Sequence, residues 1–370
     1  MIDDLHLRKQ MRRSANDVQS DHLPVLHLAQ PLGTIKQQPA ADSIEIRSGN
    51  KIERLIAAAI AIQAQDAEEA KEVGCMARAM IWASLPHKKV DGAHFQRDNG
   101  LASITMIVAP DVGLPYGKLP RTIAAWVTRE VKRTRSRELN LGKSLAEFAG
   151  KLGLSTNGGE RGDISRLKRQ ATKLFGTMIR VTPHHGQGYE YENLVLSDKG
   201  MLLWDPKRPH ERSLWQSKVI VSEAFFRECM DHAVPFDLRV LRVLRSPLAI
   251  DLYLWLTWRM FILRRPVLIP WISLRFQFGA GYPPTAQGMA HFREAFHRCL
   301  REVRTLYPSA RVVPERDGLR LLPSPPHVSE VKLGLVRQDG QSASVAAAGG
   351  HELARLGMRN GQLLRGQVSG

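Results

Sequence analysis

Cysteine is scarce in this chain, with three residues among 370. Cys75, Cys229 and Cys299 stand far apart and form no C-x-x-C pair, which excludes a disulfide framework and a structural zinc site and favours a reducing compartment. Long apolar runs are also missing, since the longest, residues 55–62 and 252–258, are too short to span a bilayer. The polar start "MIDDLHLRKQMRRS" predicts no secretory signal. We therefore expect a cytoplasmic protein.

Acidic residues are outnumbered by basic ones. The chain has 36 Asp and Glu against 53 Lys and Arg, which gives a net charge of +17 and a pI near 10.1. So large a charge indicates a polyanionic partner, either nucleic acid or an anionic membrane, and the lack of an apolar anchor favours nucleic acid. Hydrophobic residues still make up 43% of the chain, and its length suits about two domains.

A nucleotide-binding loop is absent, although "GLPYGKLPR" at residues 113–121 invites the comparison. Its two glycines are one residue too close for the phosphate-loop template, and Leu119 stands where Ser or Thr would hold magnesium. Pro115 and Pro120 remove backbone N–H groups that such a loop needs. The stretch instead predicts a turn followed by a helix with Pro120 in its first turn.

Nicking chemistry also lacks its residues. Rolling-circle initiators and relaxases use a His-apolar-His metal site and a nucleophilic Tyr, and no such His triplet occurs here. His184 and His185 are adjacent, so on a strand they would point to opposite faces. Tyr189 and Tyr191 suit packing on a hairpin better than catalysis. We therefore expect no enzyme activity, no cofactor and no metal.

One order of elements occurs twice. Each copy has a long helix, a short helix, a third helix and a hairpin, which is the order of a winged helix-turn-helix and is hard to obtain twice by chance. The first copy comprises helices at 120–138, 144–153 (with Ser144 and Glu147 as a capping box) and 163–175 (capped by Asp163), and strands at 177–183 and 189–197. The second comprises helices at 247–263, 271–279 and 286–306 and a hairpin at 310–324.

The predicted fold is therefore α+β and helix-rich, with two tandem winged-helix domains. A further helix is expected within residues 50–73. The predicted boundaries are a flexible tail at 1–50, a first domain at 51–205, a second domain at 206–327 and a flexible tail at 328–370, because both ends are polar or rich in Gly, Ser and Ala.

The third helix of each copy has an apolar stripe beside a basic one. At 100° per residue, Ile164, Leu167, Ala171, Leu174 and Phe175 share one side of the first, and Met289, Phe292, Phe296, Cys299, Leu300 and Val303 share one side of the second. We expect the first turns to read bases and later arginines to contact phosphates. The candidate DNA-binding residues are Arg166, Arg169, Lys173, Arg180, Ser273, Arg275, Thr285, Gln287, Arg293, His297, Arg301 and Arg304.

Another basic run, "REVKRTRSRE" at residues 129–138, has two readings that the sequence leaves open. It can be a solvated helix face on which Glu130 and Glu138 pair locally, or it can contact phosphates. The apolar helix beginning at Pro247 also has two readings, since it can join the two modules or hold a dimer.

Several stretches resemble the RepA-type plasmid replication initiators of bacteria. The matching pieces are "LPYG..PR", "RSREL.LG.SL.EF...LGL", "RL..Q...LF", "SEAFF", "VPFDLRVLRVLRSPLAIDLYLWL" and "LYPSARV". They occur in the family's order over roughly residues 95–328.

The resemblance implies a protein that binds repeated sequences, called iterons, in double-stranded plasmid origin DNA. Such initiators help to open an adjacent A·T-rich segment and to load the host replicative helicase, often with the host initiator DnaA, and many repress their own promoter as dimers in equilibrium with monomers. A winged-helix transcription regulator is the alternative, because the same modules serve both functions.

Overall fold

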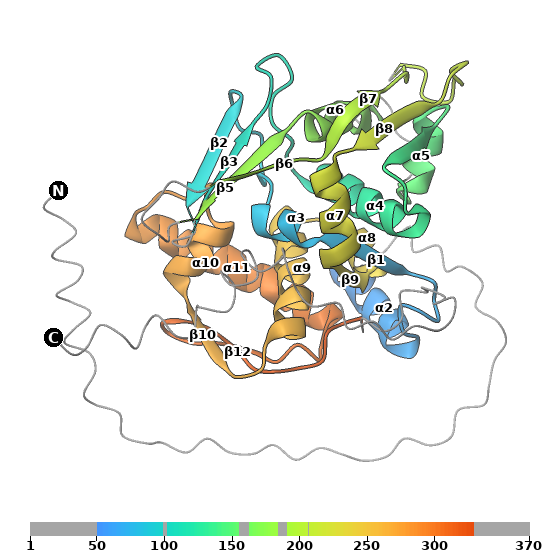
Figure 1. Ribbon diagram of the computed structural model, residues 1–370. Helices are drawn as coiled ribbons and strands as arrows, with labels where there is room; N and C mark the ends of the chain where they lie inside the picture. The colour runs from blue at the N-terminus through green and yellow to red at the C-terminus, as the bar shows by residue number, and fades with distance from the viewer. Residues whose placement is uncertain (1–49, 99–101, 155–162, 184–190, 206, 329–370) are drawn as a thin grey trace, which may run out of the picture. The chain divides into compact units, whose positions relative to one another are not determined.

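A computed structural model describes residues 50–98, 102–154, 163–183, 191–205 and 207–328 (Figure 1). The chain divides into two units, Met1–Arg47 and Ser48–Gly370, and every described residue belongs to the second. The tails predicted at 1–50 and 328–370 lie outside the described residues apart from Asn50 and Val328.

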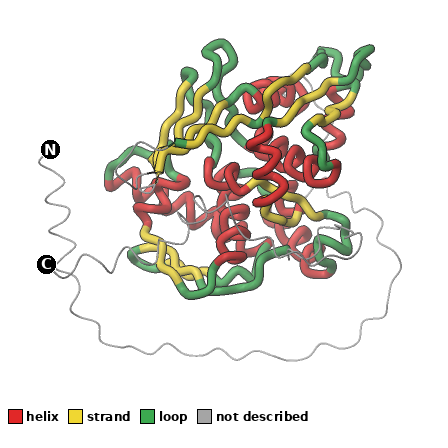
Figure 2. The backbone as a smooth tube through the Cα atoms, in the orientation of Figure 1, coloured by secondary structure: helices red, strands yellow, loops and turns green. Residues whose placement is uncertain are grey.

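The described residues form a mixed α+β structure (Figure 2). Its first half contains α2 (Lys51–Ala64), β1 (Val73–Ala77), α3 (Arg78–Ala83), β2 (His94–Asp98), β3 (Ala102–Ile107), α4 (Lys118–Thr134), β4 (Glu138–Gly142), α5 (Leu145–Lys151), α6 (Asp163–Phe175), β5 (Met178–Pro183) and β6 (Glu192–Val195). Its second half contains β7 (Ser197–Met201), β8 (Ser217–Val221), α7 (Glu223–His232), β9 (Ala233–Asp237), α8 (Leu238–Val243), α9 (Pro247–Ile262), β10 (Val267–Pro270), α10 (Trp271–Phe278), α11 (Ala286–Leu306), β11 (Val312–Pro314) and β12 (Gly318–Leu321).

The repeated order of elements is present, with one strand more per copy than the sequence predicted. The first copy runs α4, β4, α5, α6, β5, β6, and the second runs α9, β10, α10, α11, β11, β12. In the second copy the three strands form one sheet in the order β10-β12-β11. Gly318 allows this pairing, because a Cβ there would lie 2.2 Å from the Ile269 carbonyl oxygen.

The strands of the first copy pair with strands outside it. β5 and β6 continue a four-stranded sheet of order β2-β3-β5-β6, visible as neighbouring arrows in Figure 1. β4 pairs instead with β8 in the sheet β4-β8-β7, and β1 pairs with β9. These last two pairings cross the predicted boundary at residues 205/206, so main-chain hydrogen bonds join the two predicted domains.

Helix boundaries differ from the prediction where the chain turns toward a strand. The helix predicted at 120–138 ends at Thr134, because Arg135 adopts a left-handed conformation (φ 51°) and Glu138 begins β4. Thr134, the last residue of α4, has an exposed side chain. The helix expected within 50–73 ends at Ala64, and β1 takes the end of that segment.

The predicted capping box at α5 is half formed. The Ser144 hydroxyl accepts the Glu147 N–H at 3.1 Å, as predicted, but the Glu147 carboxylate accepts from the Lys143 N–H at 2.9 Å instead of returning to Ser144. For α6, the structure confirms a start at Asp163, whose side chain lies outside the described set.

α9 lies at the centre of the hydrophobic core. Every residue from Leu248 to Met260 is buried, and the helix packs against α11, α3 and β9. The apolar helix predicted from Pro247 is thus confirmed. Because its side chains are used inside the chain, few are left for a dimer interface, with Phe261 the best exposed at 37%. The three cysteines are free and buried.

Two buried arginines link the parts of the core. Arg121 of α4 forms a two-pronged ion pair with Asp251 of α9, with Nε–Oδ1 and Nη2–Oδ2 distances of 2.6 Å. Arg97 of β2 donates to the backbone carbonyls of Trp82 and Gln277, and burial lowers its pKa to about 10. The first arginine therefore joins the long helices of the two copies through charge as well as packing.

Candidate nucleic-acid interface

The outer face of α6 carries two of the predicted arginines. Leu167, Ala171 and Leu174 are completely buried, while Arg166 and Arg169 are exposed. Residues three and four apart share a helix face, so burying the apolar stripe turns these arginines outward. The predicted division of α6 is confirmed at these positions.

Lys173, the third predicted residue of α6, is half-buried against the turn that precedes α4. Its Nζ donates to the Leu114 carbonyl at 3.4 Å and lies 5.6 Å from the centre of the Tyr116 ring. Burial, together with the charge of Arg169, lowers the pKa of Lys173. Gln170 accepts the Tyr116 N–H at 3.1 Å. The "LPYG" turn therefore holds α6 in position, which the sequence alone did not indicate.

Arg180 lies on the β5–β6 hairpin. Its Nε donates to Asn193 Oδ1 at 2.8 Å, and its guanidinium stacks over the ring of Tyr191 at 4.7 Å. Both partners lie on or beside the neighbouring strand β6, so they fix the arginine on the sheet surface. The segment between the two predicted strands, residues 184–188, lies outside the described residues, as does Tyr189.

α11 matches the predicted recognition helix from its first residue to its last. Phe292, Phe296, Cys299, Leu300 and Val303 are buried, as predicted, and Met289 is half-buried at the edge of the core. The Thr285 hydroxyl caps the helix by accepting the Gly288 N–H at 3.1 Å. Because the Thr285 hydroxyl caps the helix, it has one fewer lone pair with which to accept a hydrogen bond from DNA. Gln287, on the first turn, is exposed.

The basic stripe of α11 begins on an aromatic support. Trp271, the first residue of α10, lies under Arg293 with a guanidinium-to-ring distance of 5.0 Å and meets His297 edge-on at 4.9 Å. Arg293 and His297 are half-buried, and Arg301 and Arg304 are exposed. A stacked guanidinium loses part of its freedom before it binds, which favours a defined contact.

The charge of this stripe is not neutralised within the described part of the chain. No carboxylate there pairs with Arg293, Arg301 or Arg304, and the buried Glu302 is taken by Lys51. Burial lowers the pKa of His297, and the charges of Arg293 and Arg301 lower it further. Positive potential accumulates along α11, as an interface for phosphates requires.

α10 supplies one predicted side chain that turns away from this stripe. Arg275 Nη1 donates to the Tyr282 carbonyl at 3.3 Å, and its guanidinium lies 5.5 Å from the Phe276 ring. Ser273 is half-buried. Arg275 therefore braces the turn between α10 and α11 in the described structure, and its contact with DNA stays a prediction.

Two exposed basic residues near α11 were not among the candidates that the sequence predicted. Arg316 is exposed at the tip of the β11–β12 hairpin, and Arg298 is exposed on α11 itself. The turn "RDG" and the helical spacing pointed to them. Arg320 on the same hairpin is less available, because it forms an ion pair with Glu315.

The basic run at 129–138 is largely engaged within the chain. Arg133 pairs with Glu130, and Lys218 pairs with Glu138 at 2.5 Å. Arg137 bridges Asp198 and Glu223. These ion pairs favour the reading of a solvated face over that of a phosphate-binding surface.

The described residues contain no group of three His, Cys, Asp or Glu side chains that could hold a metal ion. The same residues include no helix whose length and hydropathy would allow it to cross a membrane.

The described residues thus form an α+β structure in which two arginine-lined helices, α6 and α11, hold the same place in two similar runs of elements. Residues 114–269 match the family model described as "Plasmid encoded RepA protein". This segment runs from the "LPYG" turn to β10, and its match supports the resemblance to the RepA-type replication initiators. The matched segment contains α6 and both Arg121 and Asp251, whereas α10 and α11 lie beyond it.

Two solved structures resemble the chain at 12% sequence identity. The crystal structure of RctB domains 2-3 is matched over 65% of this chain and 94% of that chain, with a TM-score of 0.42. The selenomethionine derivative of RctB domains 2 and 3 is matched over 69% of this chain and all of that chain, with a TM-score of 0.45. No curated protein matches the sequence.

Proposed function

We propose that this chain initiates plasmid replication by binding iterons in duplex origin DNA through two winged-helix modules. The observation that carries the proposal is the unneutralised stripe of Arg293, His297, Arg301 and Arg304 on a 21-residue helix. An α-helix fits the major groove, and arginine can bond guanine O6 and N7 together. The match of residues 114–269 to the family model of plasmid-encoded RepA supports origin DNA as the target.

Residues along each recognition helix have different roles. Gln287 and Arg293 lie in the first turns of α11 and read bases, while Arg301 and Arg304 contact phosphates. α6 presents Arg166 and Arg169 in the same way, and Arg180 and Arg316 on the two hairpins contact the backbone. The Arg121–Asp251 pair connects the modules, so that both helices follow one duplex.

Further steps belong to the same proposal. Bound to its origin, the chain opens an adjacent A·T-rich segment and recruits DnaA and the replicative helicase in the bacterial cytoplasm, without a catalytic centre of its own. A monomer–dimer equilibrium separates initiation from repression of its own promoter. Sedimentation over a range of concentrations tests that equilibrium, and a monomer at every concentration contradicts it.

Protection mapping on the cognate plasmid tests the target. Repeated protected sites beside an A·T-rich tract are expected for an initiator. A single protected palindrome at a promoter would instead identify a transcription regulator. Nicked circles produced from supercoiled plasmid with a divalent metal would identify a nicking enzyme.

Substitution of α11 tests the interface. Arg293→Ala and Arg301→Ala are each expected to weaken origin binding, by about 1–3 kcal/mol where the residue contacts a base. Arg227→Ala is the matched control, because it removes the same charge from an exposed arginine of α7 that pairs with Glu223. Origin affinity equal to wild type in both α11 variants would show that the recognition helix is wrongly assigned.

A further inference from the structure

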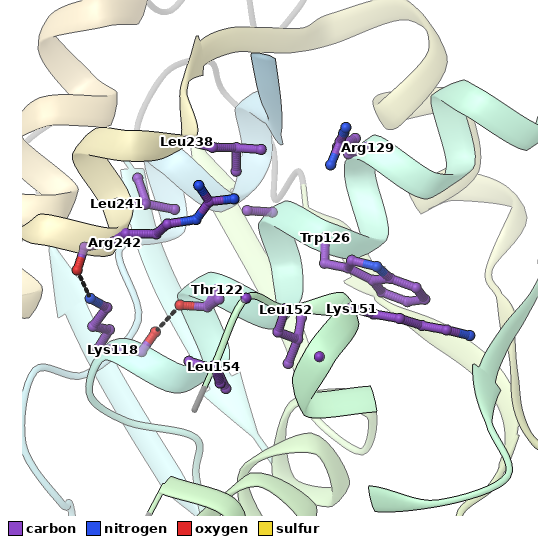
Figure 3. A pocket seen from close by; sticks show the side chains of 13 residues that line it. Lys118, Thr122, Trp126, Arg129, Lys151, Leu152, Leu154, Leu238, Leu241 and Arg242 are labelled. Atoms are coloured by element: carbon purple, nitrogen blue, oxygen red, sulfur yellow. Dashed lines mark hydrogen bonds between the residues drawn. The ribbon is translucent and has the colours of Figure 1, made fainter. Parts of the chain in front are cut away.

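A pocket of about 180 Å³ lies between α4, the end of α5 and α8, apart from both proposed recognition helices. Figure 3 shows Trp126 and Arg129 of α4 on one side, and Leu238, Leu241 and Arg242 of α8 on the other. The pocket thus lies where the first copy meets the segment that leads into the second.

The floor of the pocket is apolar and held in place. Trp126 packs edge-on against Phe148 at 5.3 Å, so its indole presents a fixed surface. Leu152 and Leu241 are buried beside it. Gly153 ends α5 with φ 66° and brings Arg242 Nε within 3.3 Å of where a Cβ would lie, so no larger residue fits there without strain.

Every charged residue that lines the pocket is basic, and these residues form its rim. Its charged lining residues are Lys118, Arg129, Lys151 and Arg242, and no Asp or Glu lines it. Two of these charges are partly balanced from outside, Arg242 by Glu72 and Lys151 by Glu147. Arg129 is exposed and has no ion pair or hydrogen bond to any described residue. A ligand with negative charge is therefore favoured.

The size of the pocket limits what can enter it. Sites for small organic ligands usually measure about 300–1,000 Å³, so this pocket is too small for a nucleotide. It has room for one apolar side chain, such as Leu or Phe. Duplex DNA offers phosphates but no such side chain, whereas an acidic peptide with an apolar residue at its centre supplies both.

We propose that this pocket binds an acidic peptide segment of a partner protein, with one apolar side chain on Trp126 and flanking carboxylates on Arg129 and Lys151. The apolar anchor supplies most of the affinity, and the basic rim selects acidic neighbours and speeds association. Because the pocket is separate from α6 and α11, a partner can be held while the chain is bound to DNA.

Two variants of the full chain test the pocket by different means. Arg129→Glu reverses the charge of a rim residue that has no partner in the described structure. Gly150→Leu adds an apolar side chain to the lining of the pocket without changing charge, and it does so without a clash, because a Cβ at Gly150 meets no atom within 4 Å. A leucine there also suits a helix better than glycine, so the fold is expected to be kept. Arg135→Glu, an exposed arginine just beyond the end of α4 and outside the pocket lining, is the matched control.

The probe is a fluorescein-labelled ten-residue peptide of Asp and Glu with a central Leu-Phe pair, and its anisotropy is measured against wild type and variants. Replacing the central pair by Ser-Ser is expected to weaken binding about tenfold or more, as are Arg129→Glu and Gly150→Leu, while Arg135→Glu binds like wild type. Binding that ignores the apolar pair or survives Gly150→Leu would overturn the proposal.

Origin DNA binding is measured for the same variants by gel shift. Both pocket variants are expected to bind origin DNA as wild type does, so a failed peptide test and a failed DNA-binding proposal remain distinguishable. If instead Arg129→Glu and Gly150→Leu weaken DNA binding and leave peptide binding unchanged, the pocket contacts nucleic acid and the peptide proposal is wrong.

Discussion

Replacing Arg121 by methionine breaks the ion pair that joins α4 to α9. In the native chain the Arg121 guanidinium holds both oxygens of Asp251 at 2.6 Å and also donates to the carbonyls of Gly117 at 2.7 Å and Leu85 at 2.5 Å. Arg121 is 3% exposed and Asp251 7%. Methionine fills similar volume without charge, so Asp251 stays buried and loses its main partner.

The expected loss of stability follows from what remains around Asp251. Removing one partner of a buried ion pair costs about 3–5 kcal/mol. Ser84 Oγ at 2.7 Å and His87 Nε2 at 2.9 Å still contact Asp251 in the variant, which favours the lower end, about 3 kcal/mol. Arg133→Met is the control, because its exposed pair with Glu130 should contribute less than about 1 kcal/mol.

The pH dependence of the loss tests its electrostatic origin. Burial raises the pKa of Asp251, but Arg121 outweighs burial and, with His87, holds it well below its usual value. The native pair is thus fully present above the unfolded pKa near 3.9 and is lost only at lower pH. Without Arg121, burial dominates and Asp251 takes up a proton as pH falls. The difference between wild type and variant should therefore shrink from pH 7 to pH 4.5.

Urea unfolding followed by circular dichroism at both pH values measures this difference. Stability of Arg121→Met within 1 kcal/mol of wild type at pH 7 would refute the reasoning. A loss that grows toward pH 4.5 would show that the missing interaction is not the charge pair. Because α4 and α9 belong to different copies, we also expect the variant to bind a full origin site less tightly.

Three further predictions concern single residues. Arg304→Ala should weaken DNA binding alike on any sequence and lower its salt dependence, whereas an origin-selective loss would argue against a phosphate contact. Gly318→Ala should destabilise the β11–β12 hairpin by about 2 kcal/mol in thermal or urea unfolding, because its Cβ would lie 2.2 Å from the Ile269 oxygen, and unchanged stability would contradict that geometry. Burial lowers the pKa of His327 to about 4; the charge of Asp237 opposes this shift and that of Arg239 adds to it. The neutral ring accepts a hydrogen bond from the Tyr253 hydroxyl at 2.7 Å. Since the unfolded pKa is near 6.5, the free energy of unfolding should fall by about 3 kcal/mol between pH 6.5 and 4 in the wild type and by less in His327→Gln. Urea titrations at several pH values measure both falls. An equal fall in the two proteins would show that His327 is not the cause.

The local sequence pattern was sufficient to predict an element whose packing partners lie close to it along the chain. α11 was predicted to the residue, because its apolar spacing and the hairpin that follows are both read within one stretch. Its basic stripe was visible for the same reason. β4 was missed, since "ELNLG" extends a helical composition and forms a strand only by pairing with β8, about eighty residues further on.

The sequence by itself determined the positive charge, the apolar α9, the repeated order of elements and the resemblance to an initiator family. Only the tertiary structure decided which basic side chains face outward. Arg121, Arg97 and Lys173 look no different from Arg301 in the sequence, yet the first two are buried among carbonyls and a carboxylate, and the third lies against Leu114 and Tyr116. Helical periodicity gives the direction in which a side chain leaves the helix axis. Whether that side chain then contacts a carboxylate, a carbonyl or water depends on segments far away in the chain.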